Sequence, residues 1–365
     1  MKKVWQFLTS IAPGDAVSND CLAISELLFD KNVGNHIGAR FNHIKSSSRA
    51  AKSIQTFEKA KKLLSPDDLV IYHLSVADEM NDWFTDLPNP KVVIYHNMTP
   101  TRYFRKYDPQ HSAASDNGRQ EASRMAGHVD LAIADSRYNA DELVEMGFSA
   151  PVVIPVLIPF EDYQTAPDPK TVEKMSDGKT NILFVGRIAP NKCQEDIIAV
   201  FSEYVKHYNQ NARLILAGSS TGMELYDSQL KKYAEALGLS DQVIFTGHVS
   251  FPEILAYYRT AHAFVIMSEH EGFCVPVVES YLFEIPVMAC DYGAIGETMG
   301  NAGVLLSRKD PGKAAAVLDQ IVKDEEFRKI QKERMKEELK RFDPEYVRAR
   351  LWETISPLLE KEETT

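Results

Sequence analysis

Short apolar runs alternate with longer amphipathic stretches along the first half of the chain. The apolar runs predict strands at 3–9, 36–41, 69–74, 91–97, 129–136 and 151–156, and the stretches between several of them predict helices at 19–31, 49–64, 117–127 and 137–146. Runs such as "LVIYHL" and "KVVIYHN" are apolar on both faces, which is typical of parallel strands that helices cover on both sides. Residues 1–158 are therefore predicted to form an α/β domain.

The pattern breaks at 159–179, which is rich in Pro, Asp and Lys and predicts a linker. It restarts over 180–342, with strands predicted at 181–186, 213–218, 242–247, 263–268, 285–290 and 303–306. The fold class is thus α/β, with two doubly wound parallel sheets whose ligands bind at the carboxyl ends of the strands, in a cleft between the halves. The tail 343–365 carries an amphipathic helix that packs on its own domain or crosses back to the first half.

Composition narrows the class of protein. The 365 residues suffice for two domains, and the formal charge of 41 − 52 = −11 argues against a nucleic-acid partner. The four cysteines form no CxxC pair, which predicts reduced thiols, a cytoplasmic location and no zinc site. The opening "MKKVWQFLTSIAPGDAV" predicts a strand and loop instead of a signal peptide, and any membrane contact is expected to be peripheral.

The stretch "SEHEGFCVPVVES", residues 268–280, places two acids around an apolar loop that opens a helix. Pro276 suits the first helical turn, so the backbone amides of 272–275 and the helix start predict an anion site. Glu271 and Glu279 flank it and would accept hydrogen bonds from sugar hydroxyls. Alternatively, Glu279 only favours the helix dipole and Glu271 is solvated.

A second loop, "FVGRIAPNKCQED" at 184–196, follows the first strand of the second half. Arg187 comes directly after Gly186, and Lys192 follows five residues later. Both cations can bind phosphate, although a surface loop with ordinary basic residues is the alternative. Together the two loops supply cations, amides and acids, which is enough to hold a nucleotide diphosphate sugar.

These loops resemble the donor domain of family 4 glycosyltransferases, retaining enzymes of the GT-B fold. The likeness is close over 180–300 and rests on Gly186, Arg187, Lys192, Glu271, Gly272, Phe273, Pro276 and Glu279, followed by Gly293 and Glu297. The resemblance implies two Rossmann-like domains facing across a cleft, with a nucleotide-sugar donor on 180–342 and an acceptor on 1–158.

The resemblance also implies roles for individual residues. Arg187 and Lys192 would neutralise the leaving diphosphate, Glu271 would bind the hydroxyls of the transferred sugar, and Glu279 would bind the ribose. Further donor-binding positions are Gly14, Gly186, Gly247, His248, Val249, Gly272, Phe273, Cys274 and Val275. Cys274 departs from the family pattern, which often has a second glycine there, and this puts the local turn in question.

Polar residues also end the strands of the first half. Asp15 is either an acceptor ligand or a helix cap. His96 resembles the residue near the anomeric carbon in this family, and a buried histidine with backbone partners is the alternative. Asn97 and Ser136 are candidate acceptor contacts, although Ser136 would equally cap the next helix. The single Gly14 gives no GxGxxG fingerprint, which argues against a dinucleotide-dependent oxidoreductase.

The implied mechanism is front-face transfer with retention, in which the leaving diphosphate helps to take the acceptor proton. No DxD-type metal site is evident, so we expect no cofactor and metal-independent catalysis by positioning and charge stabilisation. Two basic stretches, 45–62 and the aromatic-rich 101–109, would suit an anionic membrane or a lipid-diphosphate acceptor, and a solvated helix face is the alternative.

The expected donor is GDP-mannose, on a loose likeness of "SEHEGFCVP" to bacterial mannosyltransferases, with UDP-hexoses next. The expected acceptor is a growing surface polysaccharide, as a glycan or lipid-linked glycan. Two alternatives stay open at this stage. One is a nucleotide-sugar epimerase of the same architecture, and the other is a two-domain sugar-binding protein without catalysis.

Overall fold

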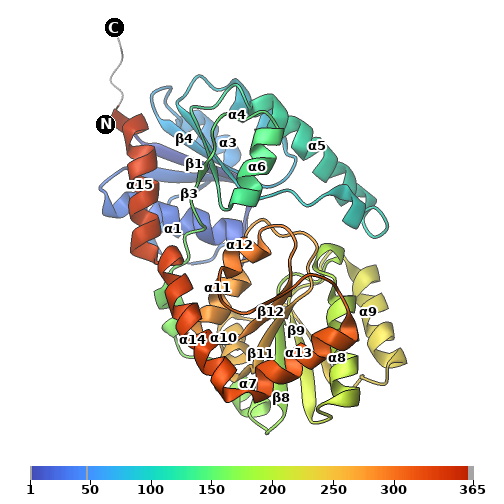
Figure 1. Ribbon diagram of the computed structural model, residues 1–365. Coiled ribbons are helices and arrows are strands. Elements are labelled where there is room, and N and C mark those ends of the chain that lie inside the picture. The colour runs from blue at the N-terminus through green and yellow to red at the C-terminus, as the bar shows by residue number, and fades with distance from the viewer. Residues whose placement is uncertain (1, 47, 361–365) are drawn as a thin grey trace. The chain divides into compact units, whose positions relative to one another are not determined.

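The computed structural model describes residues 2–46 and 48–360. The chain divides into two compact units, and each contains one parallel sheet (Figure 1). Unit 1 comprises residues 1–101, 110–159 and 342–365. Unit 2 comprises residues 102–109 and 160–341.

The sheet of unit 1 has seven strands in the order β3-β2-β1-β4-β5-β6-β7. The strands are β1 Val4–Ile11, β2 Asn35–Asn42, β3 Ile54–Thr56, β4 Leu69–Leu74, β5 Lys91–Tyr95, β6 Leu131–Ala134 and β7 Val152–Val153. The helices are α1 Ala16–Asp30, α2 Arg49–Lys52, α3 Phe57–Leu63, α4 Glu79–Asp86, α5 Pro109–Met125, α6 Arg137–Glu145 and α15 Pro344–Glu360. Chain order reverses between β1 and β4, which is the ligand-binding position of a doubly wound sheet.

Alternate residues of the central strands fill two different cores. Val70 and Tyr72 of β4 pack in one cluster with α4 residues, whereas Leu69 and Ile71 pack in the other with α1 and α15. Burial on both faces explains why these strands are continuous apolar runs in the sequence.

Unit 2 repeats this plan with six strands in the order β10-β9-β8-β11-β12-β13. The strands are β8 Thr180–Val185, β9 Ala212–Ala217, β10 Val243–Gly247, β11 Ala263–Ile266, β12 Val287–Cys290 and β13 Val304–Leu306. The helices are α7 Pro169–Met175, α8 Gln194–His207, α9 Glu224–Ala236, α10 Phe251–Thr260, α11 Val275–Leu282, α12 Ile295–Met299, α13 Pro311–Lys323 and α14 Glu325–Leu339. Here the order reverses between β8 and β11, so the loops after these two strands meet at the ligand-binding edge.

The structure differs from the expected elements in several places, and the helix expected at 117–127 begins at Pro109. Residues 49–64 form α2, β3 and α3 in place of one helix, because Ile54–Thr56 pairs with β2 at the sheet edge. Residues 160–179 belong to unit 2 and contain α7, which packs on α10, so this stretch is more than a linker. The segment Arg102–Pro109, which we call the inserted segment, belongs to unit 2 although the chain on both sides of it belongs to unit 1.

The four cysteines are buried and free, as the sequence predicts. In the part of the chain that the structure describes, no helix has the length and apolar character needed to cross a bilayer.

Candidate active site

The two loops singled out in the sequence meet at the β8–β11 switch point of unit 2. Lys192, in a 3-10 turn after β8, places its Nζ atom 2.6 Å from Oε2 of Glu271, which follows β11. The backbone joins the same loops, because the Glu269 amide donates to the Asn191 carbonyl at 2.9 Å and the Asn191 side chain donates to the His270 carbonyl at 3.2 Å. A cation and an acid that lie 79 residues apart are thus held as a pair.

Arg187 lies at the exposed side of this loop. Its Nη2 atom donates to the Thr221 carbonyl at 3.3 Å. Gly186 has φ +152°, and Gly218 after β9 passes close to it, since a Cβ at Gly218 would lie 1.9 Å from the Gly186 carbonyl oxygen. The close approach of these backbones fixes the direction in which residues 187–192 leave β8.

The turn into α11 has a left-handed backbone at Cys274, the position where this sequence lacks the glycine that is common in the family pattern. Cys274 has φ +75° and ψ 64° immediately before α11, a conformation that glycine adopts more easily. Thr298 Oγ1 donates to the Phe273 carbonyl at 2.5 Å, and a Cβ at Gly293 would lie 2.5 Å from the Glu271 carbonyl oxygen. Contacts from the α12 region therefore hold the turn, and Val275 and Pro276 form the first helical turn next to it.

Glu279 lies on α11 between two tyrosines. Tyr163 donates to Oε1 at 2.6 Å and Tyr258 donates to Oε2 at 2.5 Å. Burial raises the pKa of Glu279, and the two hydrogen bonds oppose that rise. Sequence reasoning missed both tyrosines, because they lie 116 and 21 residues from Glu279 with no motif spacing to connect them.

Three of the expected donor-binding residues, Gly247, His248 and Val249, lie at the same edge of unit 2. Gly247 ends β10 with φ +67° and forms an isolated bridge with Gly218. His248 is exposed, and Val249 is partly buried against the core cluster of α10 and α11. These residues follow the outer strand of the β10-β9-β8 side, two strands from Arg187.

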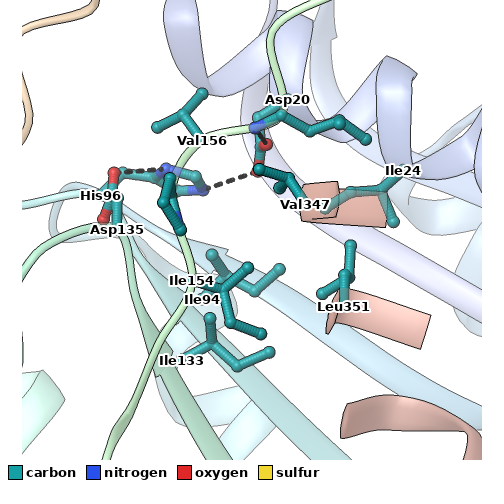
Figure 2. Close-up of a pocket in the computed structure, with 12 residues that line it drawn as sticks. Asp20, Ile24, Ile94, His96, Ile133, Asp135, Ile154, Val156, Val347 and Leu351 are labelled. Atoms are coloured by element: carbon teal, nitrogen blue, oxygen red, sulfur yellow. Dashed lines mark hydrogen bonds and ion pairs between the residues drawn. The ribbon is translucent and has the colours of Figure 1, made fainter. Parts of the chain in front are cut away.

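In unit 1, His96 follows β5 and lies among buried polar groups. Its Nδ1 atom is 3.4 Å from Oδ2 of Asp135, and its Nε2 atom is 2.9 Å from Nδ1 of His73 and 3.9 Å from Oδ2 of Asp20. Figure 2 shows the imidazole between Asp135 and Asp20, beside a cavity of about 10 Å³ lined otherwise by aliphatic and proline residues. The side chain of His96 is 4% exposed, but its ring partners are side chains and not the backbone groups of the structural alternative, and a role near the anomeric carbon stays a prediction.

The electrostatics of this cluster follow from burial and pairing. Burial raises the pKa of Asp20 to about 6, although the charge of His96 and the 2.8 Å hydrogen bond from the Leu157 amide oppose the rise. Burial lowers the pKa of His96, but the hydrogen bond and charge of Asp135 and the charge of Asp20 outweigh it, so the net pKa is raised.

The expected acceptor residues have structural partners. Asp15 is the N-cap of α1 and accepts from the Ser18 amide at 2.9 Å, and the neighbouring Gly14 has φ +75°. Ser136 is the N-cap of α6 and accepts from the Asn139 amide at 3.0 Å. Asn97, with φ +75°, donates its side-chain amide to Asn139 and Glu142 at 2.7 and 2.9 Å. Asp15 and Ser136 are therefore helix caps, and a role in acceptor binding stays a prediction for all three.

The aromatic residues of the inserted segment pack within unit 2. Phe104 is 2% exposed in the same core cluster as β8 and α8 residues. Tyr103 donates to the Glu269 carbonyl at 3.3 Å, and the Tyr107 ring lies 5.2 Å from that of Tyr226. These rings are thus used in packing within unit 2, and a membrane contact of the basic segment stays a prediction. Arg102, Arg105 and Lys106 remain exposed.

Comparisons with known proteins agree with this arrangement. Residues 168–338 match the family model described as glycosyl transferases group 1. The chain is 29% identical over 224 residues to a D-inositol 3-phosphate glycosyltransferase of Frankia alni, covering 58% of this chain and 54% of that protein. It is 23% identical over 341 residues to the serotype-specific mannosyltransferase WbdA of Escherichia coli, covering 88% of this chain and 41% of that protein. The chain therefore spans about half or less of the length of these curated relatives.

Solved structures cover nearly the whole chain. Anabaena HepE in complex with UDP-glucose superposes with a TM-score of 0.77 at 18% identity, covering 98% of this chain and 100% of that one. An Escherichia coli structure described as trehalose-6-phosphate bound with UDP-2-fluoro glucose gives a TM-score of 0.73 at 13% identity, covering 99% and 100%. The chain thus has the GT-B fold of glycosyltransferases. More particularly, the part of the chain that matches the glycosyl transferases group 1 model, residues 168–338, lies within unit 2.

Proposed function

We propose that this protein is a retaining glycosyltransferase that moves a hexose from a nucleotide sugar to a hydroxyl of a glycan or lipid-linked acceptor. The observation that carries the proposal is the Lys192–Glu271 pair at the switch point of unit 2, with Arg187 on the same loop and the start of α11 beside it. Cations next to helix-terminal amides suit a diphosphate, and the acid suits sugar hydroxyls.

The proposed reaction breaks the bond between the anomeric carbon and the diphosphate oxygen and forms a bond to the acceptor oxygen on the same face. The acceptor proton passes to the departing diphosphate. Arg187 and Lys192 would stabilise the charge that develops on the diphosphate, and Glu279, held by two tyrosines, would accept hydrogen bonds from the ribose. Two protein cations supply the positive charge, so we propose that no metal ion is required.

GDP-mannose remains the first donor to test, and the likeness to the mannosyltransferase WbdA supports this choice. UDP-glucose is the second, since HepE is described in complex with it. No comparison supports the epimerase alternative. A surface polysaccharide acceptor, a cytoplasmic location and a peripheral membrane contact belong to the same proposal.

The test is nucleotide release from a panel of GDP- and UDP-sugars, with and without EDTA, by wild type, Arg187→Ala and Glu271→Gln. We expect one selective donor, no effect of EDTA, and a loss of roughly 100-fold or more in kcat/KM for each variant, which is typical when a charge-stabilising group is removed. Arg334→Ala, at an exposed position of α14, is the matched control and should retain activity. Binding to no nucleotide sugar, or unchanged activity in both site variants, would refute the proposal.

A further inference from the structure

A line of buried polar side chains leads from the centre of the unit 1 sheet to His96. Gln6 of β1 is fully buried, and its Oε1 atom lies 3.0 Å from Nε2 of His73 on β4, which is 1% exposed. His73 Nδ1 lies 2.9 Å from His96 Nε2, and His96 Nδ1 lies 3.4 Å from Asp135. One relay therefore runs from Gln6 through His73 and His96 to Asp135.

The hydrogen positions along this relay follow from counting donors and acceptors. Gln6 Oε1 only accepts, so His73 carries a hydrogen on Nε2 and, when neutral, accepts at Nδ1. His96 then donates from Nε2, and it donates from Nδ1 as well because the Asp135 carboxylate only accepts. In this arrangement His96 is an imidazolium, and His73 stays neutral because burial and the charge of His96 lower its pKa well below the ordinary value.

If the Gln6 amide has the opposite orientation, the hydrogen positions change but both ring nitrogens of His96 keep the same partners. If the Gln6 Nε2 atom faced His73, the first two hydrogen bonds would reverse and His96 would be neutral. His96 Nδ1 would still donate to Asp135, and His96 Nε2 would still be engaged by His73. In both arrangements the two ring nitrogens of His96 are committed to groups inside unit 1.

We propose that His73 is a positioning residue, anchored on Gln6, that commits both ring nitrogens of His96 to internal partners. His96 then contributes to the proposed transfer through the fixed orientation of its ring. The charged groups that face it are Asp135 after β6, Asp20 on α1, and Asp15 at the start of α1. The consequence for activity rests on the proposed function, whereas the arrangement of protons does not.

The first experiment is ¹⁵N NMR of the histidine-labelled 365-residue chain, with the His96 signals assigned from a His96→Gln variant. We expect His96 Nδ1 to remain protonated and hydrogen-bonded from pH 5 to pH 9 in the wild type, as the relay requires. An Nδ1 signal that loses its proton in this range, in favour of an Nε2–H tautomer, would overturn the proposal without any assay of activity.

The second experiment compares two substitutions at His73. His73→Asn keeps an acceptor near the Nδ1 position, whereas His73→Phe removes it with little change of shape. We expect kcat/KM for the donor to stay within about threefold in the first variant and to fall roughly 10- to 100-fold in the second, with a shifted pH profile, because His96 loses its fixed orientation. His128→Asn, at an exposed position, is the matched control.

The outcomes separate the two proposals. Equal activity and identical His96 signals in wild type and His73→Phe would refute the positioning role. If His73→Phe does not fold, Gln6→Met, which removes the anchor at similar volume, must show the same change in the His96 signals. If the wild type turns over no nucleotide sugar but His96 shows the expected NMR pattern, the proposed function fails and the relay stands.

Discussion

Asp20 shows at the residue scale how a buried carboxyl makes stability depend on pH. Its pKa is about 6 in the folded protein against an ordinary value of 3.8, chiefly because of burial, so the folded state binds the proton more tightly. The stability that this proton contributes is complete below pH 3.8 and is lost as the pH rises through about 6. A shift of this size corresponds to about 3 kcal/mol at most.

Asp20→Asn removes this titration and keeps an oxygen to accept from the Leu157 amide. We therefore expect the variant to gain stability relative to wild type as the pH rises from 4 to 7, by about 1–3 kcal/mol. Urea unfolding of both proteins at each pH measures the difference. A difference that does not change with pH would show that Asp20 is as stable ionised inside the protein as in water.

Sequence motifs could single out residues within short loops, such as Lys192 and Glu271, and the structure brings these two side chains together. They could not predict His73 or Asp135 as partners of His96, or Gln6 as the partner of His73, because these contacts cross parallel strands that are distant in sequence. Side-chain partners of this kind depend on strand order, and strand order is a property of the assembled sheet.

At the scale of elements, α15 completes the core of unit 1 from the far end of the chain. Leu351 is 3% exposed in a cluster with Val4 and Ile71, and it also lines the cavity beside His96 (Figure 2). The sequence predicted this helix but left open which half it packs on. The apolar periodicity of a helix predicts that one of its faces is buried, but it does not predict which domain that face packs against.

Leu351→Ala should destabilise unit 1 by about 2–5 kcal/mol, since it removes buried methyl groups and enlarges an existing cavity. Hydrogen exchange of the β1 and β4 amides would measure the loss in this unit. Leu63→Ala is the control, because Leu63 is 53% exposed on α3 and should change stability by about 0.5 kcal/mol or less. Faster exchange confined to unit 2 would contradict this assignment of α15.

At the scale of the whole molecule, the chain passes between the units more often than its sequence pattern suggests. It enters unit 2 at 102, returns at 110, enters again at 160 and returns at 342. The apolar periods predicted nearly all the strands and both sheets, but the inserted segment is too short to show a period. Its aromatic residues therefore indicated a surface, although Phe104 is a core residue of unit 2.

Phe104→Ala tests this chain path, because the residue lies in the sequence of the first half and in the core of the second unit. We expect a loss of about 3–5 kcal/mol in unit 2, seen as faster hydrogen exchange of the β8 and β9 amides, with unit 1 amides unchanged. Nucleotide-sugar binding should weaken too, since Tyr103 next to it contacts the Glu269 carbonyl in the loop that carries Glu271. Phe41→Ala, at a side chain that is 52% exposed, is the matched control. Destabilisation of unit 1 alone would mean that the inserted segment packs with the half of the chain from which it comes.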